Sequence, residues 1–254
     1  MEVHHHPDLE HKKKRFKEYF LEFLMIFLAV TMGFIAENVR EGISDRNKER
    51  EYIESMIQDL KTDTAQVNEK RVDLLVQMFQ MDTLETLLRP DVNKRDSDVF
   101  ECYHIRSSIM NQHQVGFSDR TITQLVSSGN MRLINKKTVS DRITEYYSRV
   151  KVVDAQRSYY VEYFHKCLAI FPDLYTFDSY HTKLDASGNA ISPDFVFGKL
   201  RIVTTNPEAL DRFKSTIEIT KGIAGSYRAQ IGDLKKLGDS LINFLDKEYD
   251  LTNK

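Results

Sequence analysis

The sequence is poor in the residues that interrupt helices and in those that crosslink small domains. It has no tryptophan, 10 glycines, 5 prolines and two cysteines among 254 residues. So little glycine and proline favours long helices over a sheet with many turns. Cys102 and Cys167 are too few for a disulfide scaffold and lack the paired spacing of a zinc site. They either form one disulfide in an oxidising compartment or remain two thiols in the core.

The chain also lacks a large excess of either positive or negative charge. The 36 Lys and Arg residues are nearly balanced by 38 Asp and Glu residues, which leaves a net charge of −2. Bulk nucleic-acid binding requires a basic excess that this chain lacks. Residues 118–147 superficially read as a helix-turn-helix with a local positive excess, but an ordinary helix pair with solvated charges accounts for them better. No nucleic acid is therefore expected as a partner.

One long apolar run is present near the N-terminus. Residues 19–36 contain a single charged side chain, Glu22, and follow a basic cluster. A helix needs about 20 apolar residues to span a bilayer, so the run just reaches that length. A buried core helix is rarely apolar on every face. A signal peptide would need small residues at its cleavage site, and the sequence from Phe34 to Glu37 matches that pattern poorly.

The chain therefore divides into a basic tail of residues 1–18, a transmembrane helix of residues 19–37 and a soluble helical domain of residues 38–254. Lys and Arg near the ends of a spanning helix set its orientation, with the more basic side in the cytoplasm. The tail is short and densely basic, whereas the basic residues after the helix are mixed with acidic ones. We predict that the tail faces the cytoplasm and the domain faces outward.

Three N-terminal segments carry a resemblance to a known family. They are residues 1–7, with three consecutive histidines, residues 17–38 and residues 51–60. These segments resemble an uncharacterised bacterial family of single-pass membrane proteins. Residues 123–134, followed by Glu145-Tyr-Tyr147, are similar to the second recognisable block of that family.

The likeness covers the first 60 residues well, the middle moderately and the last 80 residues poorly. It implies that His4–His6 are native, and it supports a membrane location. Together with the orientation predicted from the basic tail, this leads us to expect the chain in the inner (cytoplasmic) membrane with its C-terminal domain in the periplasm. The family has no assigned activity, so the resemblance supplies no catalytic residues.

Hydrophobic periodicity predicts a mainly α fold, in which the transmembrane helix is followed by an elongated antiparallel helical bundle with one long loop region. The first bundle helix is expected over residues 44–89, with Ser44 as its N-cap and Pro90 preventing its continuation. Three polar residues, Thr64, Arg71 and Glu85, interrupt an apolar stripe with alternating steps of three and four. Met56, Leu75 and Phe79 widen it toward what a globular bundle needs. The stripe consists of Ile53, Ile57, Leu60, Val67, Leu74, Met78, Met81 and Leu88.

Three further helices are predicted before the last one. They cover residues 98–112, residues 118–129 from a Ser118 cap to a Gly129 stop, and residues 137–170, ending before Pro172. Residues 172–206 form the long loop, in which residues 185–189 are a turn signal and residues 195–197 and 200–203 could be short extended segments.

The last helix has the clearest signals. Asn206 is a favourable N-cap and Pro207 occupies the first helical position. An unbroken three-four alternation follows at Leu210, Phe213, Ile217, Thr220, Ala224, Tyr227, Ile231, Leu234, Gly238, Leu241 and Leu245. Such a seam suits antiparallel packing, so this helix and the helix of residues 44–89 are expected to lie side by side.

No catalytic, metal or cofactor site is predicted. A flexible tail does not preorganise the histidines at positions 4, 5, 6 and 11 for a metal. The sequence from Asp185 starts like a calcium loop, but Ala190 stands where glycine is required and Val196 where glutamate is required. The remaining histidines are scattered and adjoin no Ser or Cys in a nucleophile setting. The chain is therefore not expected to be an enzyme.

Glu22 is the residue most open to a functional interpretation. An ionisable group within a spanning helix is a functional candidate, although a position near the interface lets it reach water. At 100° per residue, one stripe contains Glu22, Ala29, Gly33, Ala36 and Arg40. Ala29 and Gly33 form a small-xxx-small pair, which lets two helices approach closely in lipid. We predict this stripe as a transmembrane interface for a homo-oligomer, with a different protein as the alternative occupant.

The sequence thus predicts a membrane-anchored helical interaction or sensor module, with membrane lipid and an unknown protein as partners and no cofactor. Two alternatives remain. The chain could be an accessory subunit of an ion-driven membrane complex, in which Glu22 handles protons. It could also be a membrane-tethered enzyme with a site in residues 172–206.

Overall fold

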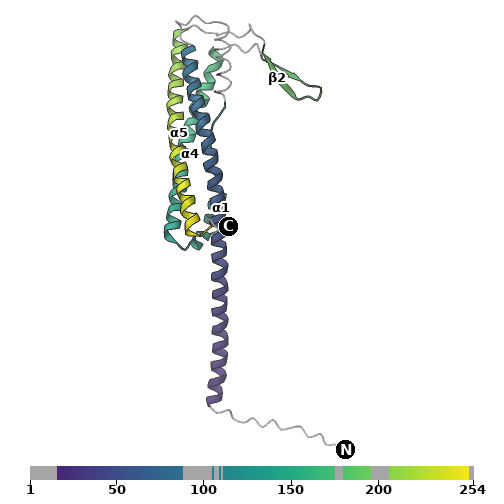
Figure 1. The fold of residues 1–254 in the computed structure, drawn as a ribbon, viewed down its shortest axis with the longest axis vertical. Helices are drawn as coiled ribbons and strands as arrows, with labels where there is room; N and C mark the ends of the chain where they lie inside the picture. Colours follow the sequence, from purple (N-terminus) through teal and green to yellow (C-terminus); the bar gives the residue numbers. More distant parts are fainter. Residues whose placement is uncertain are drawn as a thin grey trace, which may run out of the picture. The chain divides into compact units, whose positions relative to one another are not determined.

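The computed structural model describes residues 16–87, 105, 109, 111–174, 180–195 and 206–251. The chain divides into two compact units, Met1–Glu51 and Tyr52–Lys254. The predicted mainly α fold is confirmed. Its described elements, shown in Figure 1, are α1 (Phe16–Leu87), α3 (Arg120–Ser127), the 3₁₀ helix η1 (Asn130–Leu133), α4 (Lys137–Leu174), β1 (Tyr180–Leu184), β2 (Ala190–Phe195) and α5 (Pro207–Glu248).

In the first unit every described residue belongs to α1. By length and composition this helix contains one stretch able to cross a membrane, and none of that stretch is buried. The break predicted at Ser44 is wrong, because residues 38–51 are helical throughout. Ion pairs one turn apart, Arg40 with Glu37 and Lys48 with Asp45, support the helix across this charged stretch. A serine starts a helix only where the preceding backbone leaves helical geometry, and here it does not.

The second unit is a bundle of α4, α5 and the part of α1 that begins at Tyr52 (Figure 1). α4 and α5 are antiparallel, since Phe171 packs on Phe213 near one end and Lys136 pairs with Glu248 at the other. α1 and α5 are antiparallel as well, since Thr64 faces Gly238 whereas Asp82, further along α1, pairs with Lys221, nearer the start of α5. The predicted side-by-side packing of these two helices is therefore confirmed.

The seam between α1 and α5 is built on glycines. A Cβ atom placed at Gly238 would lie 3.1 Å from Thr64 Cγ2 and 3.3 Å from Tyr146 Cε2. At Gly225 the nearest atom would be Met78 Cε, also at 3.3 Å. Glycine costs helix stability relative to alanine, and here it allows two helices to approach closely.

The apolar pattern of α5 is confirmed in full, because all the positions that we predicted to form its seam are buried. Its start is confirmed as well. Asn206 is the N-cap, and its Oδ1 accepts a hydrogen bond from the backbone N–H of Glu208 at 3.0 Å. The largest fully buried side chains of the bundle include Tyr146, Tyr160 and Tyr227.

Besides the start predicted at Ser44, other predicted helix boundaries differ from the structure. α4 continues through Pro172 to Leu174, since proline in the last turn sacrifices only one hydrogen bond. α3 has Asp119 rather than Ser118 as its N-cap, and Asp119 makes no side-chain capping bond. Its stop is confirmed, because Gly129 adopts φ +69° in the left-handed region. The predicted helix of residues 98–112 lies mostly outside the described residues, and residues 111 and 112 are not helical.

The predicted turn at residues 185–189 is confirmed as the turn of an antiparallel β1–β2 hairpin. Asp185 Oδ1 accepts from the backbone N–H groups of Ser187 and Asn189, both at 2.9 Å, and Gly188 has φ +81°. The predicted extended segments of residues 195–197 and 200–203 lie outside the described residues, except for Phe195, which is the last residue of β2.

Alanine substitutions on α5 test the glycine seam. Gly238→Ala should lower the free energy of unfolding of a fragment of residues 44–254 by about 1–3 kcal/mol, because its methyl group overpacks the seam. Gly222 has nothing within 4 Å of an added Cβ, so Gly222→Ala should raise stability by up to about 1 kcal/mol through helix propensity. Urea denaturation followed by circular dichroism measures both, and equal effects of the two substitutions would refute the close approach.

Candidate functional site

A non-helical strap, defined as residues 111–119, lies against the core of the bundle and precedes α3. Its Val115 is fully buried and belongs to the main hydrophobic cluster. Backbone N–H and C=O groups at a core must be hydrogen-bonded, and this strap lies in no helix or sheet that could pair them. Side chains from α1, α4 and α5 take that role, which makes the strap the main polar junction of the described bundle.

Gln77 of α1 and Tyr160 of α4 hold the start of the strap. The side-chain amide of Gln77 donates to the carbonyls of Ile109 and Asn111, at 3.1 and 2.9 Å. The Tyr160 hydroxyl donates to Gln77 Oε1 at 2.9 Å and accepts from the backbone N–H of His113 at 3.2 Å. Burial raises the pKa of Tyr160 to about 12, so the hydroxyl keeps the proton that it donates.

Tyr227 of α5 and Arg157 of α4 hold the middle of the strap. The Tyr227 hydroxyl accepts from the backbone N–H of Val115 at 3.0 Å. Arg157 Nη1 donates to the carbonyl of Val115 at 3.4 Å. The ring of Tyr227 stacks on that of Tyr160, with centroids 5.4 Å apart. Val115 can therefore bury its side chain fully while both of its backbone polar groups are paired.

Two carboxylates of α1, one helical turn apart, hold the end of the strap and the start of α3. Asp63 Oδ1 accepts from the backbone N–H of Ser118 at 2.9 Å and from its hydroxyl at 2.8 Å. Asp59 accepts from the backbone N–H and the hydroxyl of Thr121, and from Arg120 at 3.1 Å. The hydroxyl of Ser118 is engaged by Asp63, which explains why Ser118 does not cap α3.

Asp63 is an unfavourable place for a negative charge. It is almost completely buried, and burial raises the pKa of its carboxyl above the ordinary range, although the bonds from Ser118 oppose that rise. Its second oxygen, Oδ2, has no hydrogen bond of normal geometry. The neighbouring Tyr146 and Tyr147 have pKa values raised mainly by burial, so both hydroxyls stay protonated.

The described histidines and the described cysteine do not form a nucleophilic pair. His113 Nδ1 lies 3.3 Å from Asp73, but burial lowers the pKa of His113 more than Asp73 raises it. Its imidazole is therefore neutral near pH 7, and the contact is a hydrogen bond rather than an ion pair. His165 contacts the side chain of Gln112 at 2.7 Å. Cys167 is a free, buried thiol with a pKa raised to about 12, which leaves it unreactive.

Asp82, Glu85 and Glu218 bring carboxylate oxygens within 4.8 Å of one another, close enough to share a metal ion. Lysines already supply the positive charge. Lys221 pairs with both Asp82 and Glu218, and Lys214 Nζ lies 3.5 Å from Glu85. This cluster is an ion-pair network between α1 and α5.

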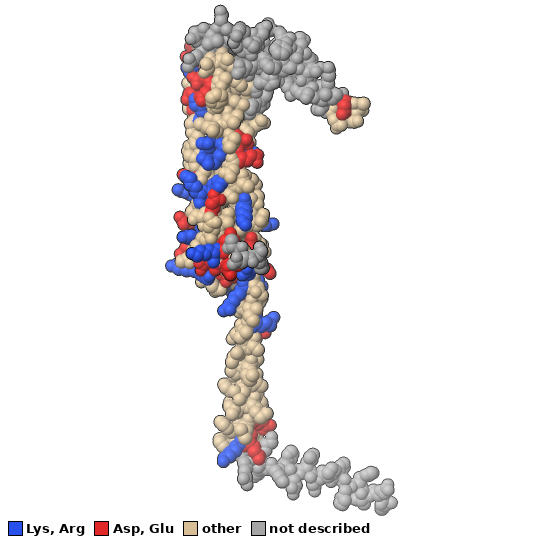
Figure 2. Space-filling view, in the orientation of Figure 1, with Lys and Arg blue, Asp and Glu red and all other residues tan. Residues whose placement is uncertain are grey.

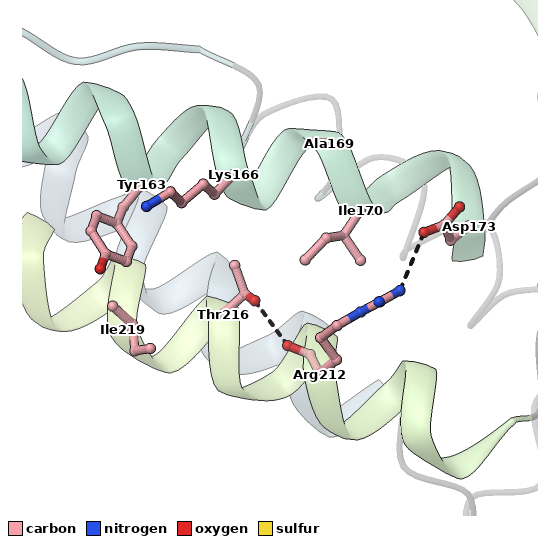
Figure 3. A pocket seen from close by; sticks show the side chains of 8 residues that line it. All are labelled: Tyr163, Lys166, Ala169, Ile170, Asp173, Arg212, Thr216 and Ile219. Atoms are coloured by element: carbon pink, nitrogen blue, oxygen red, sulfur yellow. Dashed lines mark hydrogen bonds and ion pairs between the residues drawn. The ribbon is translucent and has the colours of Figure 1, made fainter.

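Figure 3 shows a shallow groove of about 460 Å³ between α4 and α5. Arg212 reaches across it to Asp173 at 3.6 Å, and Lys166 stands over the ring of Tyr163 while pairing with Glu162. Each cation of the groove therefore already has a partner. A second groove, of about 590 Å³ between α3 and α4, has a mainly apolar lining that includes Ile122, Val126 and Met131. Neither groove, as described, brings together side chains in a catalytic arrangement.

Figure 2 shows a stretch of α1 whose surface is almost free of charge between its two ends. The predicted transmembrane residues all lie on α1 with exposed side chains. They are Glu22, Ala29, Gly33, Ala36 and Arg40. An added Cβ at Gly33 would meet nothing within 4 Å, so no contact within this chain requires glycine there. Arg40 donates to Glu37 one turn away. The interface itself stays a prediction.

Sequence reasoning did not single out the residues that hold the strap. A signal was present: Asp59 and Asp63 are spaced one turn apart beside the apolar stripe of their helix, and Gln77 interrupts it further along. Polar residues beside a core seam indicate a partner inside the fold. Their partners, however, lie 32 to 112 residues away in the chain, and periodicity carries no information at that range.

Comparison of the chain with protein-family models, with curated proteins and with solved structures gave no match. The resemblance to a bacterial single-pass family therefore stays an expectation from the sequence.

Substitution of Asp63 tests this junction. Because burial raises the pKa of folded Asp63, the folded chain binds more protons than the unfolded chain from about pH 3.9, the ordinary value, up to the raised pKa. Stability then falls as pH rises through that window. Asp63→Asn should remove this part of the pH dependence and be at least as stable at pH 7. Asp63→Ala leaves the Ser118 N–H without its acceptor and should cost about 1–3 kcal/mol.

Denaturant unfolding of residues 44–254 between pH 4 and 8 gives the measurement. If Asp63→Asn lost as much stability as Asp63→Ala, the carboxylate charge would stabilise the folded domain, and the proposed cost of burying that charge would be refuted.

Proposed function

We propose that the chain is a membrane-anchored helical module that works by binding a partner protein. The observation that carries the proposal is the exposed apolar stretch of α1. Large side chains there remain more than half exposed, among them Phe20, Phe23, Ile26, Phe27 and Phe34. A core helix with such a composition would be buried.

The physical argument for a bilayer is the cost of leaving that stretch in water. Burying apolar surface gains about 25 cal/mol per Å², so a run of exposed aromatic and aliphatic side chains strongly favours an apolar surrounding. A helix pairs its backbone groups internally, as the hydrocarbon region demands. Figure 2 shows charged residues at the start of this stretch and beyond its end, but scarcely within it.

The described part of the second unit supports binding rather than catalysis. The buried polar side chains of Gln77, Asp59 and Asp63 hold the strap and the start of α3. The carboxylate cluster of Asp82, Glu85 and Glu218 pairs with lysines. A folded helical domain on an anchor suits an interaction or sensor role, in which a partner or an assembly of copies transmits the effect.

Membrane insertion and orientation form one prediction. The full chain should sediment with membranes and resist carbonate extraction, and removal of residues 19–37 should release it to the soluble fraction. A reporter that is active only outside the cytoplasm should work when fused after Lys254. A cytoplasm-specific reporter at the same position is the control. Activity of that control alone would reverse the proposed orientation.

Self-association of the spanning segment forms another prediction. In a membrane two-hybrid assay on residues 12–42, Gly33→Ile should reduce the signal by at least an order of magnitude, because its side chain separates the two backbones. Val30→Ile, which lies off the stripe, is the matched control and should leave the signal unchanged. An equal signal from all variants, or none from the parent, would leave the stripe to a different partner.

A further inference from the structure

The outer face of α1 in the second unit carries an apolar patch. Val72, Leu75, Val76 and Phe79 are 61%, 50%, 48% and 71% exposed. Their spacing of i, i+3, i+4 and i+7 places them on one face of the helix. The prediction that Met56, Leu75 and Phe79 widen the buried stripe is confirmed for Met56 and wrong for Leu75 and Phe79.

The opposite face of the same two turns is buried in the bundle, where Leu74 and Met81 are fully inaccessible. α1 is therefore apolar on both sides at this level. A helix with apolar side chains on two opposite faces is typically covered on both of them, so the patch indicates a partner that covers it.

The size of the patch restricts what that partner is. A contiguous patch of this kind amounts to a few hundred Å², whereas a stable complex in solution buries about 800 Å² on each partner. It is too small to recruit a free protein by itself. It suffices for a partner that is already held nearby, since tethering raises the effective concentration to about the millimolar range.

A second copy of this chain meets that condition. Two chains anchored in one membrane through residues 19–37 cross it in the same orientation, so their α1 helices run parallel. Val72, Leu75 and Phe79 then occupy alternating a, d and a positions of a short parallel seam. A β-branched residue at a with leucine at d favours two-stranded pairing, which is the arrangement at Val72 and Leu75.

We propose that the α1 face formed by Val72, Leu75, Val76 and Phe79 is the docking surface for a second, parallel copy of this chain in the same membrane. The proposal rests on the membrane anchoring proposed above. It concerns a surface of the folded domain, distinct from the small-residue stripe of the spanning segment. The contact is isologous, so each residue meets its own counterpart near the twofold axis.

Disulfide crosslinking of the full chain in membranes tests the proposal. Leu75→Cys, with Cys102→Ser to remove a native thiol, should give a disulfide-linked dimer of twice the chain mass. Val152→Cys is the matched control, because Val152 on α4 is 51% exposed against 50% for Leu75. The dimer yield should be several-fold higher at position 75. Adding Phe79→Asp should lower that yield to the control level without lowering domain stability, since Phe79 is exposed.

Equal dimer yields at positions 75 and 152 would show that the crosslinks form by random collision, and would overturn the proposal. An adduct at position 75 of any other mass would assign the face to a different protein and overturn it too. Absence of the dimer while the chain stays in the membrane fraction refutes the docking surface alone. Recovery of the chain in the soluble fraction refutes the anchoring itself.

Discussion

The need to pair the backbone polar groups of residues 111–119 is the constraint on which the described bundle depends. This strap passes the core without the hydrogen bonds of a helix or sheet, so Gln77, Tyr160, Tyr227 and Asp63 must supply them. These side chains come from α1, α4 and α5, and the strap therefore connects all three helices. The fold thus accounts for the buried polar side chains of Gln77, Asp59 and Asp63.

The sequence predicted the features that depend on residues close together in the chain. It did not predict those that depend on contacts between distant residues. The start of α5 and its buried seam follow from Asn206, Pro207 and an unbroken period, all of which act within a few residues. The boundaries predicted at Ser44 and Pro172 are wrong. Serine and proline only favour a helix end, and the helix-forming residues around them outweigh that preference. The strap was not predictable, since Val115 meets Tyr227 112 residues away.

The contrast between α5 and α1 shows the same limit for the candidate surfaces. On α5 one apolar stripe predicts one buried face. On α1 periodicity assigned Leu74, Met81, Leu75 and Phe79 to the core. The structure buries Leu74 and Met81 as predicted and leaves Leu75 and Phe79 exposed. A helix that is apolar on two faces gives a pattern that sequence alone cannot divide between the core and a partner. The small-residue stripe at Ala29 and Gly33 has the same ambiguity.

Because the chain has no tryptophan, the tyrosines of the core contribute directly to its near-ultraviolet absorption and fluorescence. Tyr146, Tyr160 and Tyr227 are among the largest fully buried side chains of the described bundle, and the hydroxyls of Tyr160 and Tyr227 bond directly to the strap. Near-ultraviolet absorption and fluorescence of the chain therefore arise from tyrosine and phenylalanine alone. Detachment of the strap would move phenol hydroxyls into water and shift the tyrosine bands. Part of the signal from the 12 tyrosines therefore reports on the junction of the three helices, with no label required.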